Sequence, residues 1–159
     1  ARKNRKTIFT MGNGGSGSTA SHFVSDLQKT VIVKNENRIK AISLVDNIPV
    51  ILAWSNDVSF DKIFEEQLKN QVEKNDIVIA FSGSGKSKNI INALKTAKKM
   101  GAKCIGFTGK TGGSFNAICD ITFKVPSNDM LTIESQHVTI CHCIASTIRS
   151  LGKPMFEYD

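Results

Sequence analysis

The chain has few of the residues from which disulfide-rich or membrane proteins are built. Its 159 residues include only four cysteines, three prolines, one tryptophan and one tyrosine. No two cysteines form a CxxC pair, so neither a cysteine-ligated zinc finger nor a disulfide framework is expected. No apolar run reaches the roughly 18 residues of a membrane span, and the first residues do not resemble a signal peptide. We therefore expect a cytoplasmic protein whose cysteines are reduced thiols of the core.

Negative charge is scarce relative to positive charge. Lys and Arg number 21 against 14 Asp and Glu, which gives a formal net charge of +7. Such an excess favours anionic partners, among them phosphorylated metabolites, nucleic acid and acidic lipid. A groove for single-stranded nucleic acid would need basic residues interleaved with aromatic ones, and no such run is present. We therefore expect neither nucleic acid nor a membrane as a partner.

Short apolar runs rich in β-branched residues recur along the chain and predict buried strands. They span residues 7–11, 40–45, 76–82, 103–109 and 120–125. Segments with a helical period lie between them, at 18–31, 49–72, 87–101 and 130–151. This alternation predicts an α/β sandwich in which a mainly parallel sheet is covered by helices on both faces. No linker or repeat divides the chain, so we expect a single domain over residues 1–159.

Two loops rich in glycine and serine each follow a predicted strand and precede a predicted helix. The first is GNGGSGSTASHF (12–23) and the second is FSGSGKSKN (81–89). In a parallel sheet such loops lie where ligands bind, and helix N-termini there offer unpaired N–H groups to an anion. Glycines let the backbone approach a phosphate closely, and Ser82, Ser84 and Ser87 can direct three hydroxyls into one concavity.

The two loops do not have the spacing of nucleotide-binding motifs. GxxxxGK[ST] is absent, and GNGGSG does not fit GxGxxG, so no nucleotide cofactor is expected. The alternative is that both loops are ordinary turns, for which glycine and serine are common. Two such loops at equivalent ends of strands favour a phosphate site over two unrelated turns.

Five motifs in order resemble the sugar isomerase (SIS) domain family, in particular its phosphoheptose isomerases. They are GNGGSGSTASHF, SNDVSF, FSGSGKSKN, TGKTGG and VPSNDMLTIESQH. The resemblance implies a three-layer α/β sandwich of the flavodoxin-like or Rossmann-like kind, with a five-stranded parallel sheet. It also implies a homotetramer with active sites shared between subunits. Family members usually carry one or two further N-terminal helices, and this chain lacks them.

The resemblance further implies an activity and a set of site residues. The activity is the interconversion of sedoheptulose 7-phosphate and D-glycero-D-manno-heptose 7-phosphate through an enediol, with Asp26 as base and His142 as acid. Carried over position by position, the phosphate and sugar would be bound by Asn13, Gly14, Gly15, Ser16, Asp57, Ser82, Ser84 and Ser87. Some family members hold zinc, which here would have the ligands His22, Asp26, Glu134 and His142.

Spacing along the helices agrees with parts of this assignment. His22 and Asp26 are four residues apart and share one face of a helix. Glu134 and His142 are eight residues apart, about 12 Å along a helix axis, so long side chains can still meet between them. Two histidines and two carboxylates are ligands that suit tetrahedral zinc.

Three positions depart from the heptose isomerases. Asp26 replaces a glutamate, Glu134 replaces a glutamine, and Gly83 replaces a common threonine. Two alternatives therefore stay open: an isomerase of another phosphosugar, or a non-catalytic SIS module that binds a sugar phosphate. Among the other polar residues, we expect His137 to be packed in the core, Cys141 and Cys143 to be core residues, and Glu65 and Glu66 to be solvated.

Overall fold

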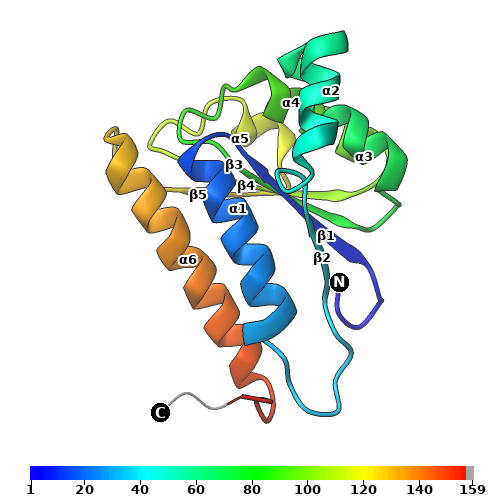
Figure 1. Cartoon of the computed structure of the whole chain (residues 1–159). Coiled ribbons are helices and arrows are strands. Elements are labelled where there is room, and N and C mark those ends of the chain that lie inside the picture. Colours follow the sequence, from blue (N-terminus) through cyan, green and yellow to red (C-terminus); the bar gives the residue numbers. More distant parts are fainter. Residues whose placement is uncertain (157–159) are drawn as a thin grey trace.

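The computed structural model describes residues 1–156, in which one parallel sheet lies between two layers of helices (Figure 1). The strand order is β2-β1-β3-β4-β5. The strands are β1 (Thr7–Gly12), β2 (Lys40–Ser43), β3 (Ile77–Phe81), β4 (Lys103–Thr108) and β5 (Ile121–Lys124). The predicted five-stranded α/β sandwich is confirmed, because every predicted strand is present with small shifts at its ends.

Each strand contributes apolar side chains to both helical layers, because successive residues of a strand point to opposite faces. Ile8 and Ile79 pack towards α1 (Gly15–Ser25) and α6 (Met130–Ser150). Phe9 and Val78 pack towards α3 (Glu65–Gln71), α4 (Lys88–Lys99) and α5 (Phe115–Ile118). Burial on both faces explains why the strands are continuous apolar runs in the sequence.

Three helical segments differ from the prediction. Residues 49–72 do not form one helical stretch but divide into α2 (Ile48–Asp57), a 3-10 turn (Phe60–Lys62) and α3, with Ser59 extended between them. The four-residue α5 was not predicted, since so short a helix has no readable period. Helix α1 begins at Gly15 and continues into a π-helical turn, η1 (Asp26–Thr30).

The loops after β1, β3, β4 and β5 lie at one edge of the sheet because the strands are parallel. Backbone hydrogen bonds join three of them: Gly109 N–H donates to Gly83 O at 2.9 Å, and Lys110 N–H donates to Ser127 O at 3.2 Å. Side chains from distant parts of the sequence therefore meet at this edge. Among the helices of residues 1–156, none combines the length and hydropathy that crossing a membrane requires.

Candidate active site

The helices that follow the two glycine-serine loops have no side-chain cap at their N-termini. Helix α1 starts after Gly14, whose φ of 54° suits glycine, and α4 starts after Ser87; neither residue caps its helix through a side chain. By contrast, Asn47 caps α2 and Asp129 caps α6 through hydrogen bonds to backbone N–H groups. Uncapped N–H groups and the positive end of the helix dipole suit an anion. The ends of α1 and α4 are therefore candidate phosphate sites.

The serine loop brings two of its three hydroxyls together. Ser82 Oγ and Ser87 Oγ lie 3.2 Å apart, and Ser82 is buried. Ser84 is exposed, and its Oγ accepts a hydrogen bond from the backbone N–H of Lys86 at 3.2 Å. Ser84 also lines a neighbouring hollow of about 230 Å³ that contains Lys86 and Lys110. Of the three hydroxyls predicted to lie together, those of Ser82 and Ser87 do so, whereas Ser84 lies apart from them in the neighbouring hollow.

Met130 occupies the space beside Gly83. A Cβ added at residue 83 would collide with the sulfur of Met130, which begins α6. The methionine side chain is long and flexible and can move aside, so a residue larger than glycine could still be accommodated at position 83. Gly83 is therefore paired with the methionine that begins α6, and the two together shape this side of the serine loop.

The first loop approaches helix α1 closely. A Cβ on Gly12 would collide with the backbone of Ser16. The chain can therefore turn from β1 into α1 only if residue 12 is glycine. Ser16 is buried in the first turn of α1, and Gly14 and Gly15 are exposed. Asn13 lies beside Gly12 and Gly14 along a hollow of about 370 Å³. These residues form the second candidate anion-binding end.

Three residues from α1, η1 and α6 converge on one point. His22 Nε2 and His142 Nε2 are 2.9 Å apart, and Asp26 Oδ2 lies 3.5 Å from the first and 3.7 Å from the second. Asp26 Oδ2 is inaccessible to solvent and has no hydrogen-bond partner, whereas its Oδ1 accepts a hydrogen bond from Thr30 Oγ1 at 3.0 Å. The π-helical turn places Thr30 against Asp26. Thr30 therefore orients the carboxylate so that its free oxygen faces both histidines.

This cluster fits a metal ion. A tetrahedral zinc with bonds of about 2.0–2.2 Å holds its ligand atoms about 3.3 Å from one another, close to the three observed separations. An unpartnered buried oxygen is costly without a cation or proton donor. Within residues 1–156, one group of at least three His, Cys, Asp or Glu side chains has ligand atoms that all lie within 4.8 Å of one another. It consists of His22, Asp26 and His142.

Glu134 lies beside this cluster but outside it. Its carboxylate packs over the Cα of Gly15, where a Cβ would collide with it, at the N-terminus of α1. Glu134 and His22 line a common hollow of about 310 Å³. Of the four predicted metal ligands, the structure brings three together and places the fourth at the helix end. A carboxylate there interacts favourably with the helix dipole.

Asp57 is not brought to the two loops. It is exposed at the end of α2, and its carboxylate accepts a hydrogen bond from the neighbouring Asn56 at 2.8 Å. His137, by contrast, is completely buried against Phe81 and Phe107, as predicted. Burial lowers the pKa of His137, and neither ring nitrogen has a hydrogen-bond partner among the described residues. The histidine is therefore a neutral core residue.

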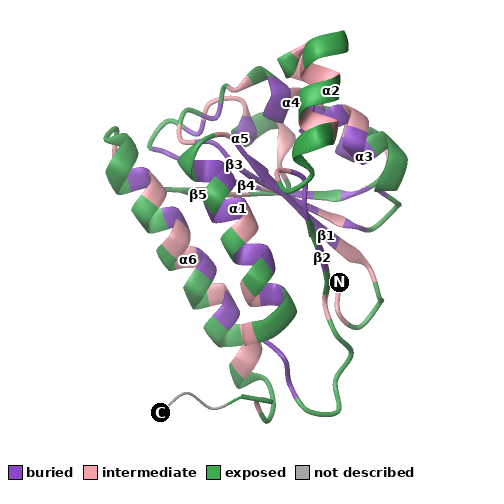
Figure 2. Cartoon of the chain, viewed as in Figure 1, coloured by how far each residue is buried: buried purple, intermediate pink, exposed green. Residues whose placement is uncertain are grey.

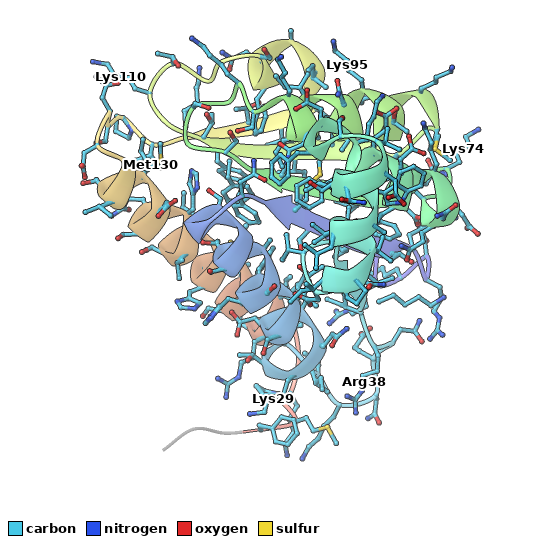
Figure 3. All side chains as sticks on the ribbon, turned by 45° about the horizontal axis from the view of Figure 1, so that its top comes forward. Lys29, Arg38, Lys74, Lys95, Lys110 and Met130 are labelled. Carbon is cyan, nitrogen blue, oxygen red and sulfur yellow. The ribbon has the colours of Figure 1, made fainter. Side chains whose placement is uncertain are left out.

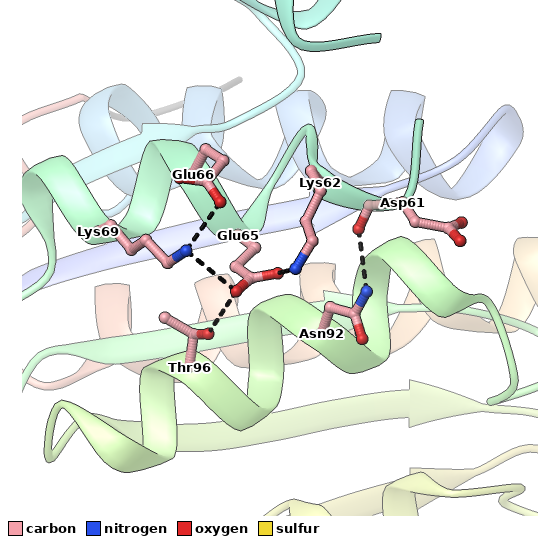
Figure 4. Close-up of polar contacts among 7 residues, drawn as sticks. All are labelled: Asp61, Lys62, Glu65, Glu66, Lys69, Asn92 and Thr96. Atoms are coloured by element: carbon pink, nitrogen blue, oxygen red, sulfur yellow. Dashed lines mark hydrogen bonds and ion pairs between the residues drawn. The ribbon is translucent and has the colours of Figure 1, made fainter. Parts of the chain in front are cut away.

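Two predictions about polar residues were wrong. Cys143 is exposed and Cys119 is only half-buried, so the core thiols are Cys104 and Cys141. Neighbouring helical residues point in different directions, which separates Cys143 from Cys141. Glu65 is buried rather than solvated, because Lys62 and Lys69 from its own helical region pair with it (Figure 4).

A further hollow lies away from these residues and is lined mainly by apolar side chains. It measures about 570 Å³ between the N-terminal residues, α6 and the sheet, and isoleucine and phenylalanine line most of it. Four lysines, Lys29, Lys74, Lys95 and Lys110, lie at separate parts of the periphery (Figure 3). The polar groups that converge are those of the two loops and the histidine cluster.

Comparison with known proteins gives the family. Residues 1–109 match the SIS domain. The chain belongs to the SIS domain family. It is 41% identical over 147 residues to a phosphoheptose isomerase of Aliarcobacter butzleri, covering 92% of this chain and 77% of that protein. It is 37% identical to a phosphoheptose isomerase of Campylobacter concisus, with the same coverage.

Solved structures of this SIS family superpose well on the chain. Phosphoheptose isomerase from Neisseria gonorrhoeae gives a TM-score of 0.87 at 28% identity and covers 94% of this chain and 79% of that chain. Phosphoheptose isomerase from Francisella tularensis gives 0.87 at 31% identity, with coverage of 93% and 78%. The resemblance inferred from five motifs is thereby confirmed.

Three residues of this SIS site were missed by the sequence reasoning: Thr30, Asn89 and Met130. Thr30 follows Asp26 by four residues, a spacing that signals contact on a helix. Asn89 is the last residue of the FSGSGKSKN motif, but no local pattern indicates that its side chain pairs with that of Asn13. Met130 contacts Gly83 only because two loops meet at the sheet edge, so no sequence signal could have identified it.

Proposed function

We propose that the protein is a phosphosugar isomerase that interconverts sedoheptulose 7-phosphate and D-glycero-D-manno-heptose 7-phosphate. The observation that carries the proposal is the free Asp26 carboxylate oxygen facing two histidines, on the helix that starts at a glycine-serine loop. From Gly15 to His22 the helix rises about 10 Å, a length that an extended sugar phosphate can span. Phosphate at the loops would leave the carbonyl end near the cluster.

The residues divide the chemistry as follows. Ketose-aldose isomerisation moves a carbon-bound proton to the neighbouring carbon while the carbonyl oxygen gains a proton, and a hydroxyl loses one. Asp26 takes the proton from carbon and returns it to the adjacent carbon of the enediol, while His142 donates a proton to the carbonyl oxygen and recovers one from the neighbouring hydroxyl. Gly14, Gly15, Ser16, Ser82, Ser84 and Ser87 hold the phosphate, and Asn13 contacts the sugar.

We further propose zinc as an alternative occupant of this site, held by His22, Asp26 and His142 with Glu134 as a candidate fourth ligand. Asp26 Oδ2 and His142 Nε2 would then bind the metal rather than a proton. A bound zinc would polarise the substrate oxygens and stabilise negative charge on them. The two carboxylates would give the site one more negative charge than a carboxylate-amide pair, which strengthens cation binding.

The first test is a proton NMR assay in D₂O. The protein is incubated with sedoheptulose 7-phosphate, with added zinc and separately with a chelator. The proposal expects new aldose signals carrying deuterium at carbon 2, and their loss with chelator if zinc takes part. Binding of the sugar phosphate without solvent exchange at that carbon would reject the isomerase and favour a non-catalytic binding module.

A second candidate is an isomerase of a different phosphosugar. Gly83 and Met130 favour it, because a methionine here fills space beside the serine loop. The test compares turnover of a panel of ketose and aldose phosphates by the wild type and by Gly83→Thr. If the pair sets the substrate, the variant shifts its preference towards sedoheptulose 7-phosphate; an unchanged ranking speaks against this candidate.

We also infer a homotetramer in the cytoplasm. None of the ten residues of α2 is buried (Figure 2), and Ile48 and Leu52 on it are 60% and 62% exposed. A helix so apolar gains from burial against another copy, and His22 and His142 are exposed on a single chain, as a site shared between subunits would be. Light scattering gives the assembly mass; a monomer at micromolar concentration would contradict the inference.

A further inference from the structure

An amide pair joins the two glycine-serine loops. Asn13 Nδ2 donates to Asn89 Oδ1 at 3.0 Å, and Asn89 Nδ2 donates back to Asn13 Oδ1 at 2.8 Å. Asn13 follows β1, whereas Asn89 lies in the first turn of α4. Within residues 1–156, these are the side-chain hydrogen bonds that link the first loop to residues 82–89. They tie together the two uncapped helix ends.

The orientation of this pair is fixed by the backbone of α4. The N–H of Ile90 donates to Asn89 Oδ1 at 3.0 Å. If the Asn89 amide were rotated by 180°, its NH₂ group would face this N–H, and two donors would then lie against each other. Asn89 is only 2% exposed, so water cannot replace the lost bond. The Ile90 N–H therefore fixes the orientation of the Asn89 amide, and the Asn89 amide in turn fixes the orientation of the Asn13 amide.

Asn13 keeps part of its bonding capacity after pairing. One Nδ2 proton and one Oδ1 lone pair remain, and Asn13 lines the hollow of about 370 Å³ beside the first loop. Without Asn89, the amide could present either end to that hollow. A wrongly oriented amide offers an acceptor where a ligand needs a donor, which costs about as much as an unmade hydrogen bond.

We propose that Asn89 is a positioning residue of the phosphosugar site and acts through Asn13. It holds the Asn13 amide in one orientation towards the hydroxyls of the bound sugar, and it holds the N-termini of α1 and α4 at one separation. This inference rests on the proposed function for its substrate. The hydrogen-bond geometry itself does not depend on that substrate.

A double-mutant cycle tests the proposal in the full chain. Asn89→Ala is expected to lower kcat/KM by about 10-fold, mainly through KM, and Asn13→Ala by at least as much. The double variant is expected to be no worse than Asn13→Ala alone, because Asn89 then has nothing to orient. If the two losses multiply instead, Asn89 acts independently of Asn13 and the proposal is wrong.

A matched control lies on the same helix. Asn92 also donates a side-chain hydrogen bond, to the backbone oxygen of Asp61 at 3.1 Å, but it does so away from both loops. Asn92→Ala should leave kcat/KM unchanged. Asn89→Leu keeps the buried volume filled, so it should reproduce the Asn89→Ala loss even if alanine reduces stability. An active Asn89→Leu enzyme would overturn the proposal.

A second readout separates this inference from the proposed function. The Nδ2 proton of Asn13 that is bonded to Asn89 should exchange slowly with solvent in the wild type and at least about 10-fold faster in Asn89→Leu, because the hydrogen bond protects it. A wild type that turns over no sugar phosphate would reject the proposed function, and the exchange rates would still decide the role of Asn89. Equal exchange in both proteins would overturn that role.

Discussion

Asp26 and Glu65 are two carboxylates of similar burial on opposite faces of the sheet, with side chains 14% and 11% exposed. Glu65 is fully paired: Lys62 lies at 2.6 Å, Lys69 at 3.2 Å, and Thr96 donates at 3.3 Å (Figure 4). Asp26 has one oxygen bonded to Thr30 and one with no partner. Saturation marks Glu65 as structural, and the unmet oxygen marks Asp26 as part of a site.

The strongest challenge to this comparison is to remove the charge of Asp26. Asp26→Asn should lower kcat by ~10²- to 10⁴-fold, the range typical of a lost acid-base group. Stability should not fall, because no hydrogen bond to Oδ2 is lost. Single-turnover rates and thermal melts measure the two effects. A stable variant with wild-type turnover would remove Asp26 from the chemistry.

Asp26→Glu asks whether reach matters. A glutamate carries the carboxylate further, into the space shared by His22 and His142. Displacement of a catalytic group by about an ångström can cost ~10²-fold in rate. The variant should therefore lose activity on the natural substrate if the site is built around aspartate. A gain in sedoheptulose 7-phosphate turnover would show that this chain has drifted from that substrate.

Thr30→Val sharpens the comparison by disturbing only the orientation of Asp26. Valine keeps the shape but cannot donate to Oδ1, so the carboxylate gains a second unbonded oxygen. Loss of such an orienting contact typically costs about 10- to 100-fold in metal affinity, measured by competition with a chromophoric chelator. Thr30→Ser retains the hydroxyl and should bind metal like the wild type; equal losses in both variants would contradict an orienting role.

Glu65→Gln is the mirror experiment on the paired carboxylate. It removes one anion from Lys62 and from Lys69, which keeps its pair with Glu66. Because both lysines are partly exposed, the cost should be about 1 kcal/mol. Turnover per folded molecule should be unchanged. Urea unfolding at neutral pH measures the stability, and a drop in kcat would show that this cluster reaches the site.

The smallest expected effect is on pH dependence. Burial pushes the pKa of Glu65 upward, but hydrogen bonds and charge from Lys62 and Lys69 outweigh it, so the pKa lies below its ordinary 4.5. The stabilisation is therefore present above about 4.5 and is lost as pH falls through the lowered pKa. Unfolding free energy should decline less steeply below pH 4.5 in Glu65→Gln than in the wild type; identical slopes would contradict the assignment.

Much of this molecule could be predicted from local patterns. Apolar runs gave the strands, because strands buried on both faces must be apolar throughout. The two loops were recognisable because glycine and serine before a helix start have a physical use there. The i, i+4 spacing of His22 and Asp26 placed them on one helix face, and both lie in the cluster.

Two inferences depended on more than a local pattern. Glu65 was predicted to be solvated, because a charged residue on a helix usually is, but it is buried. The carboxylate of Glu134, a predicted metal ligand, lies over Gly15 and beside the other three residues. Helix spacing gives a direction and a height along one axis. It does not give the packing of α6 against α1.

The sequence by itself determined the fold class, the family and the positions of the loops, because these follow from short-range periodicity and ordered motifs. Only the tertiary structure decided that His142 meets His22 from 120 residues away, that Thr30 turns Asp26 towards them, and that Asn89 orients Asn13. Contacts of this kind depend on which helices and strands become neighbours, and a chain's local chemistry does not specify those neighbours.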